Sequence, residues 1–185
     1  MPKTILGIVG ETGAGKGEAV EYLKKKFGEK VPVLKFSTAL SEVLNIFFDE
    51  VRKEDQQWLV GHLRERFGED ILARSVEKKI ENAAEGLILL DGLRVRGDEE
   101  MVRRNGGQII FITAPSRLRW GRLQGREEKG DDKATFEKFL EMKDAPSERQ
   151  IKEIGGRADF KIDNSGDWNY LYKQLDELII KLKLQ

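Results

Sequence analysis

The stretch from Gly10 to Gly17 holds the residues with the clearest chemistry. It reads Gly-Glu-Thr-Gly-Ala-Gly-Lys-Gly, follows the apolar run Ile5–Val9 and precedes a helix-like run. Glycines let backbone N–H groups turn inward and approach a polyphosphate closely, and a helix start adds a partial positive charge. Lys16 supplies a mobile cation for the outer phosphates. The order strand, glycine-rich loop, lysine and helix therefore predicts a phosphate-binding loop.

The position after the lysine departs from the common form of this loop. Gly17 stands where a serine or threonine usually offers a hydroxyl to magnesium. Glu18 is awkward beside phosphate, so it either turns away as a first-turn helix residue or meets the metal's water shell. Asp91 ends the apolar run Leu87–Leu90, and a carboxylate at the carboxyl end of a neighbouring strand can orient Mg²⁺ and its waters. We predict that Asp91 handles the metal through water, with a helix cap or turn as the alternative.

Four arginines lie between residues 117 and 126. Arg119, Arg122 and Arg126 are spaced three and four apart, so they share one face of a predicted helix. Arginine suits a bidentate grip on phosphate and neutralises charge on a transferring phosphoryl group. The alternative is a solvated basic face paired with the acidic residues that follow. We favour that alternative for Arg117, and a functional role for Arg122 and Arg126.

The composition limits the class of protein. The 185 residues suit one domain, and Lys+Arg and Asp+Glu both total 33, so net charge gives no argument for nucleic acid or an anionic membrane. The chain has no cysteine and a single histidine, His62, which argues against thiolate or histidine metal sites. No run approaches the ~20 apolar residues of a membrane span, and no signal peptide fits. We expect a soluble cytoplasmic protein, either a monomer or a homodimer.

Apolar periodicity predicts alternating strands and helices. Strands are expected at 4–9, 31–36, 87–90, 108–113 and 158–162, and helices at 18–27, 40–51, 54–67, 69–84, 98–104, 116–126, 132–143 and 168–184. This order predicts a five-stranded parallel α/β sheet with right-handed crossovers. A helical insert at 38–84 and a charged segment at 127–148 should lie over the strand ends where ligands bind. Trp58, Trp120 and Trp168 occupy core-like helix positions, and we interpret them as packing residues.

Taken in order, these motifs resemble the nucleoside monophosphate kinase group of P-loop proteins, which includes adenylate kinases. Residues 13–17 are similar to the adenylate-kinase loop, residues 89–94 to its Asp-Gly-Phe-Pro-Arg motif, and residues 122–126 to the Arg-Leu-x-Gly-Arg of its lid. The insert 53–73 looks more like the deoxynucleoside monophosphate kinase and dephospho-CoA kinase-like branch. Val43 stands where adenylate kinases carry an acceptor-binding arginine, which argues against AMP as the substrate.

The resemblance implies a three-layer P-loop NTPase fold with a five-stranded parallel sheet, a helical acceptor-binding insert at 38–84 and a lid at 127–148, all in one kinase domain spanning 1–185. It implies an ATP- and Mg²⁺-dependent enzyme that phosphorylates a small phosphorylated metabolite, with a (deoxy)nucleoside monophosphate preferred. Two alternatives stay open. One is a dephospho-CoA kinase-like enzyme, whose hydroxyl acceptor would need Asp91 as a base. The other is a regulatory nucleotide-binding ATPase.

The candidate site residues fall into three groups by role. Asn164 belongs to a turn, Asn164–Gly166, that either lines a base pocket or is plain turn chemistry. The catalytic candidates are Lys16, Asp91, Arg122 and Arg126; the ATP-binding candidates are Gly10, Gly13, Ala14, Gly15, Lys16, Gly17, Glu18 and Asn164; the acceptor-binding candidates are Ser37, Thr38, Lys53, Gln57, Arg64, Arg94 and Arg96. The expected partners are small-molecule nucleotides, with neither nucleic acid nor membrane.

Overall fold

A five-stranded, all-parallel sheet forms the centre of the computed structural model, which describes residues 3–28, 30–125, 135–143 and 145–184. The strand order is β2-β3-β1-β4-β5, as expected for right-handed crossovers on both faces. Central strands read as continuous apolar runs because helices cover both of their faces. The strands are β1 (Lys3–Gly10), β2 (Val33–Lys35), β3 (Gly86–Asp91), β4 (Gln108–Thr113) and β5 (Phe160–Asp163).

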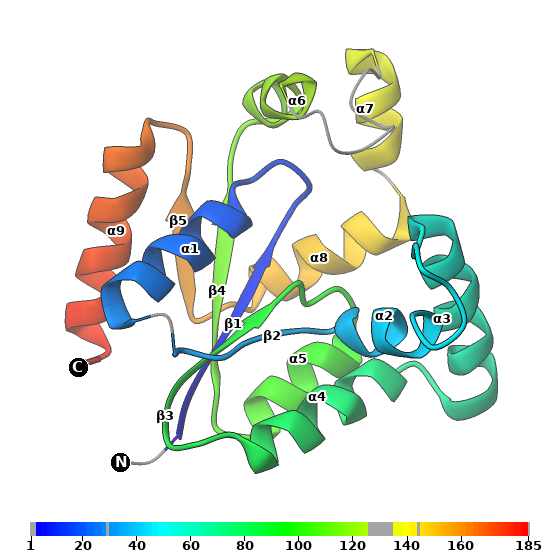
Figure 1. Ribbon diagram of the computed structural model, residues 1–185. Helices are drawn as coiled ribbons and strands as arrows, with labels where there is room; N and C mark the ends of the chain where they lie inside the picture. Colours follow the sequence, from blue (N-terminus) through cyan, green and yellow to red (C-terminus); the bar gives the residue numbers. More distant parts are fainter. Residues whose placement is uncertain (1–2, 29, 126–134, 144, 185) are drawn as a thin grey trace.

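Helices form a layer on each side of the sheet (Figure 1). The helices α1 (Lys16–Phe27) and α9 (Trp168–Lys181) bury one core with Leu6, Ile8 and Ile112 of the strands. The helices α4 (Ile71–Asn82), α5 (Arg96–Arg104) and α8 (Pro146–Gly156) bury the other core. The predicted three-layer α/β architecture is therefore confirmed.

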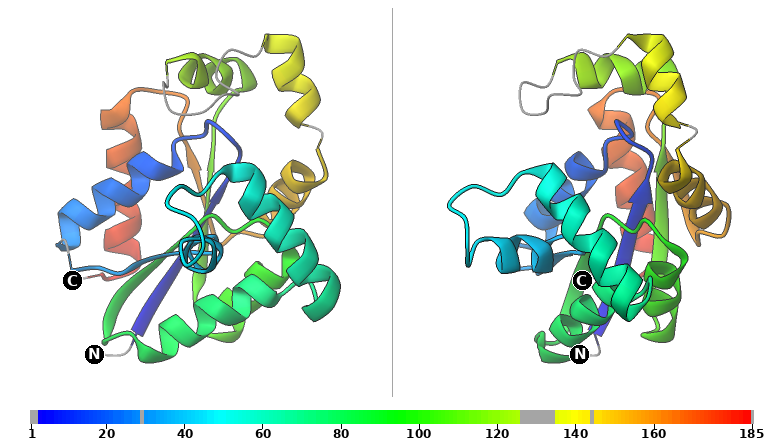
Figure 2. Two further views of the ribbon diagram at one scale, coloured as in Figure 1. Left: turned by 45° about the vertical axis from the view of Figure 1, so that its right-hand side comes forward. Right: turned by 90° about the vertical axis from the view of Figure 1, so that its right-hand side faces the viewer.

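Two further groups of helices are added to these layers (Figure 2). The first comprises α2 (Thr38–Leu44) and α3 (Lys53–Phe67), which join β2 to α4. The second comprises α6 (Ser116–Gln124) and α7 (Phe136–Lys143), which lie beyond the end of the sheet where β1 and β4 finish. The first group interrupts the simple strand–helix alternation, as the sequence predicted for 38–84. The predicted lid segment 127–148 lies partly outside the described residues. Within the described residues, no helix is long and apolar enough to cross a membrane.

The structure differs from the sequence-based expectation at several elements. The helix α8 was not predicted, because Ile151 and Ile154 are its only buried hydrophobic residues, too few for a recognisable apolar stripe. The helix α2 ends at Leu44 instead of continuing to residue 51. Interpreting Trp58 and Trp168 as packing residues was wrong, since they are 63% and 47% exposed.

Candidate functional site

The loop Gly10–Gly17, called the phosphate loop below, joins β1 to α1 and is shaped by its glycines. Gly13 and Gly15 have positive φ angles of 79° and 98°, which side chains rarely adopt. A Cβ on Gly15 would lie 2.2 Å from Nδ2 of Asn164. Lys16 Nζ donates to the carbonyl oxygens of Gly10 and Glu11, at 2.7 and 3.2 Å. A glycine-rich loop that leads into the start of a helix has the form of an anion-binding site.

A buried ion pair fixes the first part of the phosphate loop, at Glu11 and Thr12. Arg119 of α6 is 2% exposed, and its Nη2 donates to Oε1 of Glu11 at 2.9 Å. The same guanidinium donates to the carbonyl oxygens of Thr12, at 3.0 Å, and Ala114, at 3.0 Å. Thr113 at the end of β4 donates its hydroxyl to the other oxygen of Glu11. Arg119 is therefore a structural clamp on the loop, unlike Arg122 and Arg126, for which the sequence favoured a functional role.

A second carboxylate, that of Glu148, contacts Thr12 in the same part of the loop. The Thr12 hydroxyl donates to Oε1 of Glu148 at 2.7 Å, and the Thr12 N–H points at Oε2 at 3.4 Å. Glu148 lies in the first turn of α8 and is 7% exposed. Helices α6 and α8 thus hold one residue of the phosphate loop between them.

Asn164, Arg122 and Trp168 lie together at another side of the loop. Asn164 is fully buried, and its amide donates to the carbonyl oxygen of Ala14 at 2.8 Å. Its Oδ1 has no hydrogen-bond partner among the described residues. Arg122 Nη2 donates to the Asn164 carbonyl oxygen at 3.0 Å, and its guanidinium lies 5.6 Å from the centre of the Trp168 ring.

Among the described residues, Arg122 donates to two backbone carbonyl oxygens and forms no ion pair with a carboxylate. Burial lowers the pKa of its guanidinium because desolvation disfavours the charged form. Its buried Nη1 also lacks a hydrogen-bond partner within the described part of the chain. A partly buried cation beside the phosphate loop is suited to bind an anion or the face of an aromatic ring. Arg126, the other arginine predicted to grip phosphate, lies outside the described residues.

Gly17 and Asp91 line one pocket of about 450 Å³ between α1 and the edge strand β2. A Cβ on Gly17 would meet nothing within 4 Å, so this side of the loop is open. Asp91 ends β3, opposite Ile8 of the neighbouring β1. The remaining lining residues are Val20, Glu21, Lys24, Val31, Val33 and Lys35.

The donor set at this pocket fits magnesium held mainly by phosphate and water. Mg²⁺ characteristically takes one or two carboxylates plus phosphate oxygens and waters, and Asp91 supplies such a carboxylate. Within the described residues, no cluster of three or more His, Cys, Asp or Glu side chains forms a protein-only metal cage. Glu18 turns away, since its Oε1 accepts a short hydrogen bond from the Tyr172 hydroxyl of α9. That bond raises the pKa of Tyr172.

The predicted acceptor residues are only partly brought together. Arg64 of α3 and Arg94, three residues beyond Asp91, both act electrostatically on Asp98, although burial dominates and raises the pKa of Asp98. Asp98 Oδ2 accepts the backbone N–H groups of Arg94 and Val95, so it fixes this turn. Neither Arg64 nor Arg94 lines the pocket beside Gly17, and the other candidates, Ser37, Thr38, Lys53 and Gln57, do not line it either.

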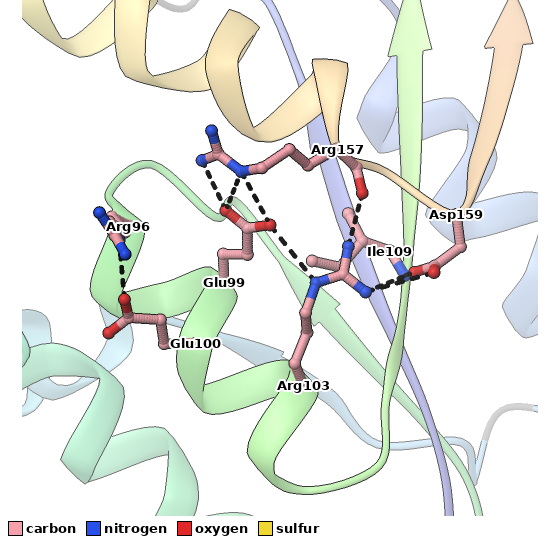
Figure 3. A network of polar contacts seen from close by, with 7 residues as sticks. All are labelled: Arg96, Glu99, Glu100, Arg103, Ile109, Arg157 and Asp159. Atoms are coloured by element: carbon pink, nitrogen blue, oxygen red, sulfur yellow. Dashed lines mark hydrogen bonds and ion pairs between the residues drawn. The ribbon is translucent and has the colours of Figure 1, made fainter.

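Arg96 belongs to a different cluster, drawn in Figure 3. Its Nε donates to Glu100 at 2.8 Å. Nearby, the buried Glu99 accepts hydrogen bonds from Arg157 and Arg103. Burial alone would raise the pKa of Glu99, but the two arginines outweigh it and hold that pKa below its ordinary value. This cluster joins α5 to the start of β5 and has a structural role.

Several residues of the site were missed or misjudged from the sequence. Glu11, Thr12 and Glu148 carried no signal beyond their polarity, and their partners are distant in sequence. Trp168 could have been suspected, because it follows the turn Asn164–Gly166 at the beginning of a helix. Residues that contact the loop from other elements are defined by tertiary packing, which spacing along the chain does not encode.

The chain resembles UPF0200 proteins over nearly its whole length. The chain is 26% identical to the UPF0200 protein of Methanothermobacter thermautotrophicus over 186 residues, covering 98% of this chain and 92% of the relative. It is 28% identical to the UPF0200 protein of Sulfurisphaera tokodaii, covering 96% of this chain and 97% of the relative. The chain matches no family model.

Solved structures resemble the whole chain. TT1252 from Thermus thermophilus superposes with a TM-score of 0.61 at 20% identity, covering 98% of this chain and 99% of that one. Shikimate kinase from Bacteroides thetaiotaomicron gives a TM-score of 0.61 at 17% identity, with the same coverage. The chain has the fold of the P-loop kinases. At such low identity the likeness identifies the fold and not the substrate.

Proposed function

We propose that this chain is an ATP- and Mg²⁺-dependent phosphotransferase. Its preferred acceptor is a small phosphorylated metabolite, first a (deoxy)nucleoside monophosphate. The observation that carries the proposal is the placement of the phosphate loop between two different surfaces. Arg122, Asn164 and Trp168 adjoin it on one side, and the pocket of Gly17 and Asp91 adjoins it on another. A donor and an acceptor can then meet at the loop.

The donor nucleotide is assigned to the side of Arg122. The N–H groups of Gly13, Gly15 and Gly17 and the Lys16 ammonium bind its phosphates. The Ala14 N–H, which the sequence also assigned to ATP, donates instead to the Glu11 carbonyl oxygen at 3.0 Å. The base lies near Trp168, which is half exposed and can stack on it. Asn164 is fully buried, so it supports this side of the loop through its hydrogen bond to the Ala14 carbonyl oxygen and does not meet the base.

The acceptor is assigned to the side of Asp91. Arg94 and Arg64 carry positive charge to the turn after β3, where an acceptor phosphate would be held. Bound magnesium would lower the charge on the phosphates, and Asp91 would hold its waters. The protein then supplies mainly orientation and charge neutralisation, which are the principal needs of phosphoryl transfer. A phosphate acceptor is already an anion and needs no base.

A hydroxyl acceptor, as in a dephospho-CoA kinase-like enzyme, is the second candidate. The observation that favours it is the Asp91 carboxylate in the pocket, which can take the hydroxyl proton. The regulatory ATPase alternative requires nucleotide turnover without any small acceptor.

An assay with labelled ATP distinguishes the three candidate functions, which are transfer to a phosphate acceptor, transfer to a hydroxyl acceptor and ATP hydrolysis alone. The purified protein is incubated with Mg²⁺, [γ-³²P]ATP and, one at a time, nucleoside monophosphates, deoxynucleoside monophosphates, dephospho-CoA and shikimate. The proposal expects label on a monophosphate. Label on dephospho-CoA or shikimate selects the hydroxyl acceptor. Release of inorganic phosphate alone, unchanged by every acceptor, favours the ATPase.

A further inference from the structure

Glu148 has no role in the phosphotransferase proposed above, yet its carboxylate lies against the phosphate loop. It is 7% exposed, and a buried carboxylate is costly unless its charge is well compensated. Among the described residues Glu148 forms no ion pair. Its compensation is the start of α8, where a negative charge is favourable, and the two hydrogens of Thr12.

Thr12 is held through all of its polar groups. Its hydroxyl and N–H point at Glu148, at 2.7 and 3.4 Å, and its carbonyl oxygen accepts from Arg119 at 3.0 Å. The next residue, Gly13, packs so closely on α6 that a Cβ would lie 2.7 Å from the Arg119 carbonyl oxygen. Rotation of the Thr12 peptide would therefore turn the Gly13 N–H, one of the groups assigned to phosphate.

We propose that Glu148 is a positioning residue, which acts through Thr12 to keep the phosphate loop in its phosphate-binding shape. This inference rests on the proposed function, because it assumes that the loop binds a nucleotide. It makes α8 part of the nucleotide site although α8 touches no nucleotide in this assignment. Preorganised donors bind an anion better than donors that must first be ordered.

The charge of Glu148 works against this positioning effect, and the two can be separated. A carboxylate close to the loop repels the phosphates of a nucleotide. Glu148→Gln keeps an oxygen for the Thr12 hydroxyl but removes the charge, whereas Glu148→Ala removes both. A purely electrostatic Glu148 would make both variants bind ATP more tightly. Positioning requires opposite effects, because only the alanine variant frees Thr12.

The test is a calorimetric titration of MgATP into the intact protein, which measures the dissociation constant. Glu148→Ala and Thr12→Val should each weaken binding about tenfold, the value of one lost hydrogen bond to a charged group. The double variant should also be about tenfold weaker, and not a hundredfold, since both changes break one interaction. Glu148→Gln should bind at least as tightly as the wild type, and Thr12→Ser should stay within about threefold. Glu153→Gln, an exposed change on the same helix, should have no effect.

Either of two results overturns the inference: unchanged binding in Glu148→Ala and Thr12→Val, or effects that multiply in the double variant. Melting temperatures identify any variant that fails to fold. If Glu148→Ala is one, the comparison of Thr12→Val with Thr12→Ser decides, and equal binding by these two counts against positioning. A wild type that does not bind MgATP contradicts the proposed function itself, which distinguishes that failure from this one.

Discussion

Glu11 and Arg119 form a buried ion pair, 2.9 Å long, between the phosphate loop and α6. Their side chains are 8% and 2% exposed, and Arg119 also donates to two backbone carbonyls of the loop and of the β4–α6 turn. The pair therefore joins the loop to the helix that also carries Arg122. Any account of the site must treat α6 as part of the loop's support.

Breaking this pair should destabilise the fold. Arg119→Ala leaves the Glu11 carboxylate buried without its counter-charge, so we expect a loss of about 3 kcal/mol in the free energy of unfolding. Urea titration measures it. The matched control is Arg104→Ala, whose ion pair with Glu77 is at the surface with a 58% exposed arginine, and which should lose less than about 1 kcal/mol. Equal losses in the two variants would show that the Glu11–Arg119 pair is not a special support.

Arg122 is assigned to nucleotide binding, and Arg117, on the same helix, to packing. Arg122→Ala should weaken MgATP binding about tenfold or more, because the nucleotide loses its interaction with a desolvated cation. Arg117→Ala is the control on the same helix, since its guanidinium lies 5.1 Å from the Trp120 ring centre and 4.6 Å from that of Phe136. Calorimetric titration compares the two. Weaker binding in the Arg117 variant alone would reverse the assignment.

Two arginines near the start of α5, Arg94 and Arg96, should differ in their effect on the KM for the acceptor. Arg94→Ala should raise the KM for the acceptor about tenfold or more and leave the affinity for ATP unchanged, because Arg94 is assigned to the acceptor phosphate alone. Arg96→Ala should change neither, since Arg96 pairs with Glu100 in the separate cluster. Steady-state kinetics with each substrate varied measures both. A selective effect of Arg96 would restore it to the acceptor site and remove Arg94.

How far the sequence predicts this molecule depends on the range of the interaction. Local patterns are sufficient for the phosphate loop, the parallel strands and the position of Asp91, because each depends on neighbours in the chain. The partners of Glu11, Thr12 and Glu18 come from α6, α8 and α9, more than 100 residues away. No spacing rule connects such pairs, so Arg119 was grouped with Arg122 although its guanidinium is buried in the fold.

The exposed tryptophans also show what helical spacing in the sequence cannot predict. Trp58 and Trp168 have the helical spacing of core residues, yet both stand at the surface. The Arg122 guanidinium lies over the Trp168 ring. The rings of Trp58 and His62 are tilted by 39° to each other, with ring centres 4.4 Å apart. Periodicity says which residues share a face of a helix. It does not say whether another element covers that face.

The cluster around Glu99 should make stability depend on pH. In the folded protein the pKa of Glu99 is lowered from the ordinary value of 4.5. Between the lowered and the ordinary pKa, the unfolded chain therefore binds more protons than the folded protein does. The contribution of Glu99 is therefore fully present above about pH 5 and is lost as pH falls through the lowered pKa. Glu99→Gln should unfold at a lower urea concentration at pH 7, and the difference from the wild type should shrink towards pH 3. A difference that stays constant with pH would mean that charge is not what stabilises the cluster.

The central claim is that the phosphate loop serves phosphoryl transfer to a small acceptor. The most direct measurement is the division of label from [γ-³²P]ATP between acceptor and inorganic phosphate, with Lys16→Ala as the inactive control. The account predicts that one (deoxy)nucleoside monophosphate takes up label faster than water does, and that Lys16→Ala lowers this rate by about a hundredfold or more. Label that appears only as inorganic phosphate with every acceptor, or transfer that survives in Lys16→Ala, would contradict it.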